Sequence, residues 1–190
     1  KIAQENGKFD DEIVPITVKQ RKGEFVFDKD EHINLTTNEE KLANLRPAFK
    51  KDGSVTAGSS SGINDGASFM MIASEEAIEK YNLTPLAEIV SVGQGGVEPE
   101  VMGLGPVPAI NQAMKRSSID FKAIDLIELN EAFAAQSLGV FKDLEKAYGL
   151  KTEDMLKYTN VNGGAIALGH PVGASGNRIT VTLVHEMLKR

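Results

Sequence analysis

The sequence contains no cysteine and only three histidines. Without cysteine, these residues form no disulfide, bind no zinc through thiolates and supply no cysteine nucleophile. The histidines are His32, His170 and His185, and their spacing does not match a local metal-binding motif. We therefore expect no metal site in this chain.

Long runs of one residue type are also lacking. No apolar run approaches the roughly 20 residues that a membrane-spanning helix requires, and no signal peptide opens the sequence. The formal net charge is −6, from 21 Lys and Arg against 27 Asp and Glu, with no long basic block. This balance argues against nucleic acid or an anionic membrane as a partner. We expect a cytoplasmic protein and, because the first residue is Lys1 rather than Met, a piece of a longer one.

The composition is that of a globular protein, with 41% apolar and 25% charged residues in 190. Strand-like and helix-like segments alternate, which indicates a layered α/β architecture. The expected strands are 13–19, 25–27, 66–73, 86–92, 124–129 and 158–162. The expected helices are 37–45, 74–81, 108–115, 131–146 and 176–190. A change of composition near Pro85 suggests a boundary between two units.

One histidine lies in the glycine-rich stretch GGAIALGHPVGASG, residues 163–176. Glycine allows unusual backbone angles and lets another group approach the main chain. A turn of this kind before a helix also occurs for packing alone, and an isolated histidine is more often structural than catalytic. Asn130 is equally ambiguous, because it follows the expected strand 124–129, where it serves either as a helix cap or as part of a ligand site. These patterns alone name no reaction.

Three segments together resemble the thiolase family, specifically its acetyl-CoA acetyltransferases. They are TAGSSSGINDGA (56–67), NEAFAAQ (130–136) and NGGAIALGHPVGASG (162–176). In the related ketoacyl synthases, the stretch around this histidine is similar to GHTxGAAG instead. The resemblance covers essentially all 190 residues. It implies the α/β thiolase fold, in which each core domain has layered α/β/α structure around a mixed five-stranded sheet, here present only in part.

The resemblance also implies a division of the chain. Residues 1–62 match the end of the loop domain that binds CoA, 63–84 the end of the N-terminal core domain, and 85–190 the C-terminal core domain without its last strands. Thiolases are about twice as long. Their nucleophilic cysteine would precede Lys1, and a second cysteine, in a CxGxG stretch, would follow Arg190. The chain therefore resembles the C-terminal half of a thiolase without either catalytic cysteine.

The family resemblance gives the glycine-rich stretch a chemical role. The matching His170 would activate the nucleophilic cysteine and then donate a hydrogen bond to a thioester oxygen. Asn130 would hold the water that supplies the second donor. Gly169, Gly173 and Glu131 would support the oxyanion site and its loop.

The same resemblance assigns residues to substrate binding. Ser61 matches the position that hydrogen-bonds the pantetheine arm of CoA. Ala57, Ile63 and Phe49 match the apolar lining of that arm. Phe133 and Met102 would shape the acyl pocket, and the bulk of Met102 is compatible with short acyl groups.

The function implied is part of an acyltransferase of fatty acid metabolism, which condenses two acetyl-CoA reversibly to acetoacetyl-CoA and CoA. These thioesters are substrates, so no cofactor is expected. The alternatives are a degradative 3-ketoacyl-CoA thiolase and a non-catalytic, thiolase-like CoA-binding or scaffold chain. The expected protein partners are further copies, as in the family's homotetramers, or the rest of the polypeptide. Without a nucleophile, the 190 residues alone are expected to be inactive.

Overall fold

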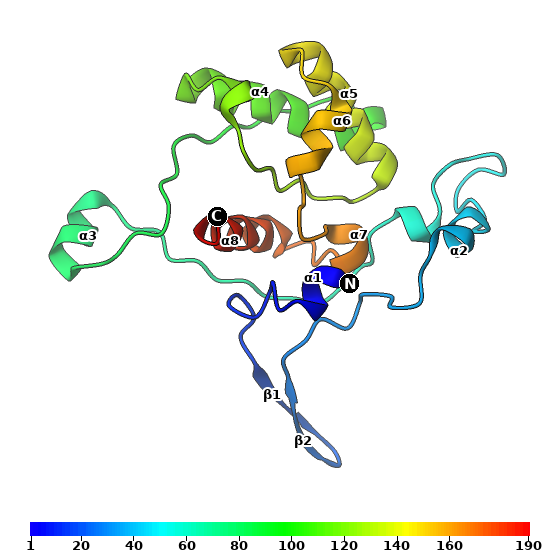
Figure 1. Ribbon diagram of the computed structural model, residues 1–190, viewed down its shortest axis with the longest axis horizontal. Coiled ribbons are helices and arrows are strands. Elements are labelled where there is room, and N and C mark those ends of the chain that lie inside the picture. The colour runs from blue at the N-terminus through cyan, green and yellow to red at the C-terminus, as the bar shows by residue number, and fades with distance from the viewer.

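Helices dominate the structure, and the only sheet is a two-stranded hairpin. The structure is a computed structural model and describes residues 1–190. Strands β1 (Ile16–Gln20) and β2 (Gly23–Phe27) pair antiparallel, from Ile16 opposite Phe27 to Gln20 opposite Gly23. The hairpin projects from the body of the molecule (Figure 1). It confirms the strand predictions for 13–19 and 25–27, with the first strand shifted towards the turn.

The expected helices are present. The α-helices are α1 (Ile2–Glu5), α2 (Glu39–Ala43), α3 (Glu75–Tyr81), α4 (Pro106–Ser117), α5 (Ala134–Tyr148), α6 (Thr152–Met155), α7 (Ala165–Leu168) and α8 (Ser175–Leu188). In two of them the N-cap residue's own side chain caps the helix, because Asn38 Oδ1 accepts a hydrogen bond from Lys41 N and Ser74 Oγ accepts one from Ala77 N. Four short 3₁₀ turns, Ala57–Ser59, Pro99–Leu104, Phe121–Ala123 and Leu156–Tyr158, connect these elements.

The hydrophobic core lies where α4, α5 and α6 meet, at the top of Figure 1. Its fully buried members include Val140, Phe141 and Leu144 of α5 and Met155 of α6. The spacing of Val140, Phe141 and Leu144 along α5 places these three side chains on one face, as expected for an amphipathic helix. This core supports the segment 124–130, which leads to the candidate site.

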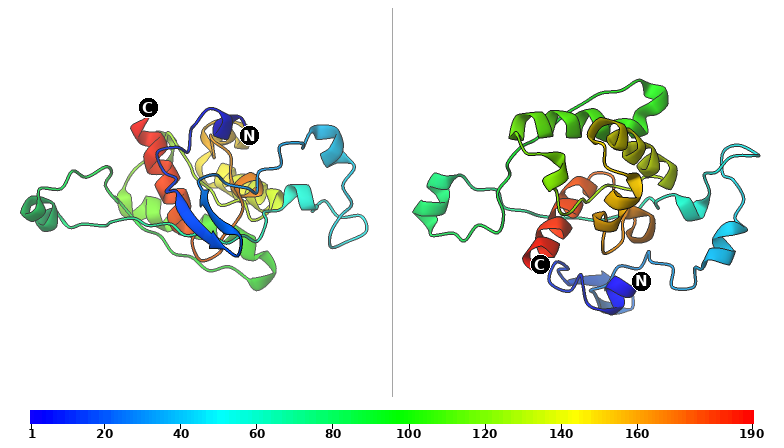
Figure 2. Two further views of the ribbon diagram at one scale, coloured as in Figure 1. Left: turned by 90° about the horizontal axis from the view of Figure 1, so that it is seen from below. Right: turned by 45° about the horizontal axis from the view of Figure 1, so that its top comes forward.

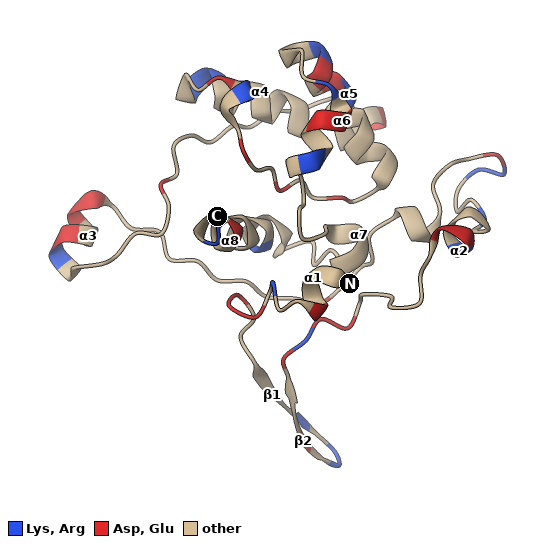
Figure 3. Ribbon diagram, in the orientation of Figure 1, with Lys and Arg blue, Asp and Glu red and all other residues tan.

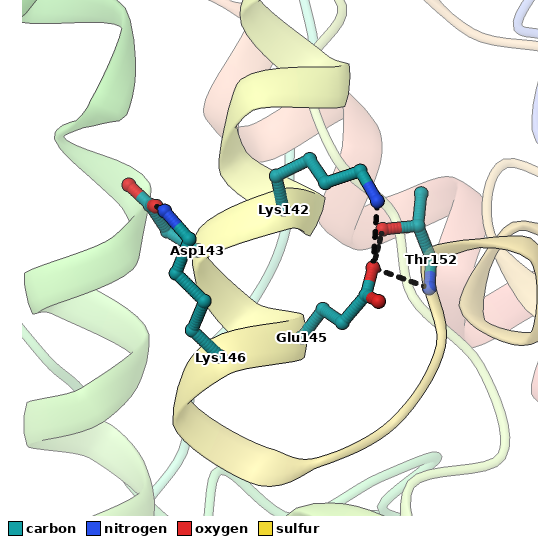
Figure 4. Close-up of polar contacts among 5 residues, drawn as sticks. All are labelled: Lys142, Asp143, Glu145, Lys146 and Thr152. Atoms are coloured by element: carbon teal, nitrogen blue, oxygen red, sulfur yellow. Dashed lines mark hydrogen bonds and ion pairs between the residues drawn. The ribbon is translucent and has the colours of Figure 1, made fainter.

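A polar contact joins α5 to α6 beside this core (Figure 4). Glu145 Oε2 accepts hydrogen bonds from Thr152 Oγ1 at 2.7 Å, Thr152 N at 3.2 Å and Lys142 Nζ at 3.1 Å. Hydrogen bonds from Thr152 and Lys142 favour the carboxylate and lower the pKa of Glu145 to about 2. Glu145 thus caps the first turn of α6 from the preceding helix.

The five-stranded sheet is not formed within residues 1–190, and four strand predictions are wrong for this chain. Segments 66–73 and 86–92 have no ladder partner, and 124–129 makes only an isolated parallel bridge, Ile127 to Thr159. A strand exists only when a neighbour completes its hydrogen bonds, and no extended segment pairs with 66–73 or 86–92. The bridge at Thr159 is all that forms of the expected strand 158–162.

The molecule is consequently open. Helices α2 and α3 lie on opposite sides of the molecule in every view, each carried on long connecting segments (Figures 1 and 2). The accessible surface is 13,592 Å², whereas a compact monomer of this mass exposes about 8,900 Å². Apolar side chains of the unpaired segment contribute, since Phe69 is 90% exposed and Met71 82%.

Helix α8 lies at the centre and binds the N-terminal segment. Thr182 Oγ1 donates to Glu12 Oε1 at 3.0 Å, and Lys189 Nζ lies 3.1 Å from Asp11 Oδ2. Basic and acidic residues alternate over the ribbon rather than gathering by sign (Figure 3). No helix combines the length and the apolar character that crossing a membrane would require.

Candidate active site

Three segments far apart in the sequence meet at His170, joined by backbone hydrogen bonds. His170 N donates to Gly62 O at 3.2 Å, and Ile63 and His170 form a parallel bridge. Ser61 N donates to Ala132 O at 3.0 Å, in the stretch that follows Asn130. The segment 60–63 therefore lies between the NEAFAAQ and GHPVGASG stretches and holds them together without a regular sheet.

The ring of His170 is fixed through both nitrogens. Nδ1 lies 2.6 Å from Ser175 Oγ, and Ser175 Oγ donates to the Pro171 carbonyl at 3.1 Å. Asn130 Nδ2, which only donates, lies against Nε2, so in this arrangement Nε2 accepts, Nδ1 carries the ring proton and Ser175 Oγ accepts from it. The lone pair of Nε2 then faces Asn130 Nδ2, at 3.3 Å. The site presents an imidazole whose basic nitrogen is oriented by its neighbours.

The glycine before the histidine is required by its backbone. Gly169 has φ +96°, where side chains are strained. A Cβ at this position would also collide with the amide of Asn64, whose Oδ1 accepts from His170 N at 3.2 Å. Gly173, in contrast, has open space around it, so its supporting role stays a prediction.

Asn130 and Glu131 have different surroundings at the end of the segment 124–129. Asn130 Oδ1 is buried and receives no hydrogen bond from the chain. Glu131 is hydrogen-bonded at both oxygens, accepting from Asn160 Nδ2 at 2.7 Å and from Ile166 N in α7 at 3.3 Å. Glu131, the residue next to Asn130, therefore connects Asn160 to α7, the helix that leads to His170.

A cavity of about 790 Å³ adjoins Asn130 and has mainly apolar walls. Phe133 and Met102 line it, and Met102 lies at its mouth with 76% of its surface exposed. Glu128 also faces it; burial raises the pKa of Glu128 to about 7, and its Oε2 has no partner. His170 is not in the wall, so Asn130 is the residue that joins the histidine to the cavity. No group of three or more His, Cys, Asp or Glu residues is placed to hold a metal ion.

Nearly the whole chain matches known family models. Residues 1–76 match the family model of the thiolase N-terminal domain, and 83–190 match that of the thiolase C-terminal domain. The chain belongs to the thiolase family.

Relatives of this thiolase chain agree in fold and differ in name. An acetyl-CoA acetyltransferase of Syntrophomonas wolfei is 53% identical over 188 residues, 99% of this chain and 46% of the relative. The crystal structure of the Bacillus anthracis acetyl-CoA acetyltransferase has a TM-score of 0.91 at 49% identity, covering 100% of this chain and 46% of that one. The crystal structure of human mitochondrial 3-ketoacyl-CoA thiolase in complex with CoA has a TM-score of 0.83 at 46% identity, covering 100% of this chain and 45% of that one. The chain thus spans about half the length of its relatives. These matches confirm the expected family and a partial thiolase fold, while the boundaries at 62/63 and 84/85 stay predictions.

The substrate-binding residues expected in a thiolase lie on an open face. Phe49 packs edge-to-face on Phe133, with ring centroids 6.5 Å apart, yet remains 77% exposed. Ile63 is 97% exposed and Ala57 is also exposed, while Ser61 is half-buried. The structure therefore brings Ser61 to Ala132 and Phe49 to Phe133, in the stretch that begins at Asn130, but does not enclose a pantetheine channel.

Sequence reasoning missed three residues that shape this thiolase site: Ser175, Asn64 and Asn160. Ser175 was detectable in principle, because it lies five residues after His170 in the sequence and begins α8. Asn64 is 106 residues from His170, and Asn160 is 31 from Leu129. No local pattern connects residues at such separations.

Proposed function

We propose that residues 1–190 are part of a thiolase that condenses two acetyl-CoA to acetoacetyl-CoA and CoA, and catalyses the reverse thiolysis. The observation that carries the proposal is the oriented pair formed by His170 Nε2 and Asn130 Nδ2 at 3.3 Å, beside an apolar cavity. In this proposal the chain supplies the oxyanion site and the CoA-binding loop. The nucleophile lies outside residues 1–190, because they contain no cysteine.

In the first half-reaction, His170 Nε2 accepts the proton of the nucleophilic thiol, and a thiolate is the reactive form. The thiolate attacks the carbonyl carbon of acetyl-CoA, and CoA leaves with the proton. In the second, a base outside residues 1–190 takes a proton from the methyl carbon of another acetyl-CoA, which attacks the enzyme thioester; acetoacetyl-CoA leaves, and that proton returns to the cysteine thiolate. The enolate oxygen formed in this step needs a fixed donor, and the neutral imidazole supplies one in the tautomer that carries its proton on Nε2.

Asn130 supplies the second donor through a water. Its Oδ1 is buried without a donor in the chain, and a buried acceptor is satisfied when a water donates to it. The other proton of that water then points to the substrate oxygen. Ser61 binds the pantetheine arm, and Phe133 and Met102 bound the acyl group. The CoA thioesters are the substrates and no further cofactor takes part.

The second candidate function is degradation of longer 3-ketoacyl-CoA. It is favoured by the likeness to human mitochondrial 3-ketoacyl-CoA thiolase and by the exposed position of Met102 at the cavity mouth, which leaves the acyl pocket open. A non-catalytic CoA-binding chain is the remaining alternative, favoured by the absence of cysteine. It leaves the oriented histidine without a purpose.

The exposed apolar surface supports a partner of the same family fold. Extensive exposed apolar surface associates with another surface or aggregates. Segment 66–73, in addition, lacks the neighbouring strands that a sheet requires. We propose that the remainder of a thiolase polypeptide covers it, and that the assembled protein is a homo-oligomer.

The test is a chimera in which residues 1–190 replace the matching segment of the Syntrophomonas wolfei enzyme. We expect it to cleave acetoacetyl-CoA in the presence of CoA, faster than it cleaves 3-ketoacyl-CoA substrates with longer chains. His170→Ala should abolish this activity while CoA binding, measured by calorimetry, is retained. A preference for long chains would support the second candidate, and CoA binding without turnover would support the scaffold.

The chain by itself is the matched control. Residues 1–190 expressed alone should show no thiolysis above background and should elute as associated species in size-exclusion chromatography. A monomer that turns over acetoacetyl-CoA would refute both the chemical and the packing argument.

A further inference from the structure

We propose that Asn160 is a positioning residue that holds Asn130 within reach of His170. It acts on the residues on either side of Asn130, through the backbone of Leu129 and the carboxylate of Glu131. The inference deepens the proposed function and rests on it for its kinetic consequences. Its geometric part is independent of the reaction.

Asn160 lies where two chain segments stop pairing. Ile127 N donates to Tyr158 O at 3.0 Å, and Asn160 N donates to Ile127 O at 2.8 Å, as in a parallel ladder. At Asn160 the backbone turns away with φ +46°. The next residue of the other segment that needs a partner is Leu129, which is buried.

The side chain of Asn160 completes the pairing that its backbone abandons. Its Oδ1 accepts from Leu129 N at 2.8 Å, and its Nδ2 donates to Leu129 O at 2.9 Å. A side-chain amide carries the same donor and acceptor groups as a peptide unit. The chain is therefore held straight for one more residue, up to Asn130.

A third contact fixes the other side of Asn130. Asn160 Nδ2 also donates to Glu131 Oε1 at 2.7 Å, while Glu131 Oε2 accepts from Ile166 N at the start of α7. Gly164 makes this approach possible, because a Cβ there would overlap the Glu131 carboxylate. Both neighbours of Asn130 are thereby held, and its side-chain Nδ2 reaches His170 Nε2 at 3.3 Å.

The left-handed backbone at Asn160 lies where the chain enters a turn, since Gly163 N donates to Asn160 O at 2.7 Å. The two other non-glycine residues with positive φ, Asn82 and Ser118, each end an α-helix, where this conformation is common. Asn160 ends no α-helix. Asparagine tolerates the conformation better than most residues, and only its side chain reaches Leu129.

The kinetic test uses Asn160→Ala and Asn160→Gly in the chimera. Glycine accepts φ +46° without strain, so the pair separates backbone strain from the lost contacts. We expect both to lower kcat for acetoacetyl-CoA thiolysis about tenfold with KM within twofold, because Ser61 and the cavity are untouched. Asn82→Gly, at a left-handed residue of α3 away from the site, is the matched control and should leave kcat unchanged.

A double-mutant comparison separates positioning from general destabilisation. If Asn160 acts through Asn130, adding Asn160→Ala to Asn130→Ala should lower kcat no more than twofold further. A full tenfold further loss would overturn the proposal. So would loss of folding in both the alanine and the glycine variants, since Asn160 would then serve the fold rather than the site.

Amide hydrogen exchange tests the geometry without turnover, in the chimera and in the 190-residue chain. In Asn160→Gly the Leu129 amide should exchange about fivefold faster, the change expected for one lost hydrogen bond, while the Ile127 amide is unchanged. Equal exchange at Leu129 in wild type and variant would overturn the inference. If instead His170→Ala and Asn130→Ala retain full turnover, the proposed function fails, while the exchange result still decides whether Asn160 holds the backbone of Leu129.

Discussion

Replacing Ser175 by alanine tests how the histidine is oriented. Ser175 is 3% exposed, and its hydroxyl is the acceptor for His170 Nδ1–H at 2.6 Å. Alanine leaves that N–H without an acceptor in the protein. The imidazole then has no reason to keep its proton on Nδ1, and the tautomer with Nε2–H would point a donor at the Asn130 amide donor.

The magnitude follows from the lost hydrogen bond. A buried donor left without a partner costs about 1–3 kcal/mol, which corresponds to about 5- to 150-fold in a rate. If the cost falls on the productive tautomer, Ser175→Ala lowers kcat by that factor and leaves KM for acetoacetyl-CoA nearly unchanged. Ser175→Thr, which retains a hydroxyl, should recover most of the activity.

The assay is the steady-state thiolysis of acetoacetyl-CoA by the chimera, with melting temperatures measured in parallel. Ser137→Ala is the matched control, because Ser137 is also buried and its Oγ has no hydrogen-bond partner. It should leave kcat unchanged. Activity of Ser175→Ala within twofold of Ser137→Ala would refute the tautomer argument.

Three further outcomes are expected. His170→Ala should lower kcat more than Asn130→Ala, whose loss of one oxyanion donor costs about 10²–10³-fold; equal, small effects in the chimera would contradict both roles. Glu128→Gln should stabilise the chimera by about 1–2 kcal/mol near pH 8, after allowance for partial solvation, and should have no such effect near pH 4 in urea titrations. Burial raises the pKa of Glu128 from its ordinary 4.5 to about 7, so the folded wild type is destabilised as pH rises through that window and Glu128 ionises. Glu145→Gln should lower the melting temperature near pH 7, and the difference should shrink as pH falls from about 4.5 to 2, since the lowered pKa of Glu145 stabilises only the ionised form; a constant difference would exclude this.

The helices were readable because their signals are local. Ser74 before two glutamates predicts the start of α3, and an apolar repeat predicts α5, since caps and amphipathic faces depend on residues within a few positions of one another. The expected helix 131–146 begins three residues later, at Ala134. The extended stretch before it is what carries Asn130 and Glu131 to the site.

Segments 66–73 and 86–92 show the opposite case. Their largely apolar composition indicates buried strands, yet a strand forms only where a neighbouring segment supplies the hydrogen bonds. That neighbour is not among residues 1–190, so the same sequence remains unpaired and exposed. Composition sets the propensity of such a segment, and long-range pairing decides its structure.

The candidate site divides in the same way. The sequence by itself determined the residue types, namely a histidine among glycines and an asparagine in NEAFAAQ, and through them the family. Only the tertiary structure decided that His170 and Asn130, 40 residues apart, lie 3.3 Å from each other, that Ser175 contacts the histidine and that Asn160 contacts both neighbours of the asparagine. Hydrogen bonds between distant residues form only after the chain has closed the loops between them, and no periodicity in the sequence records that closure.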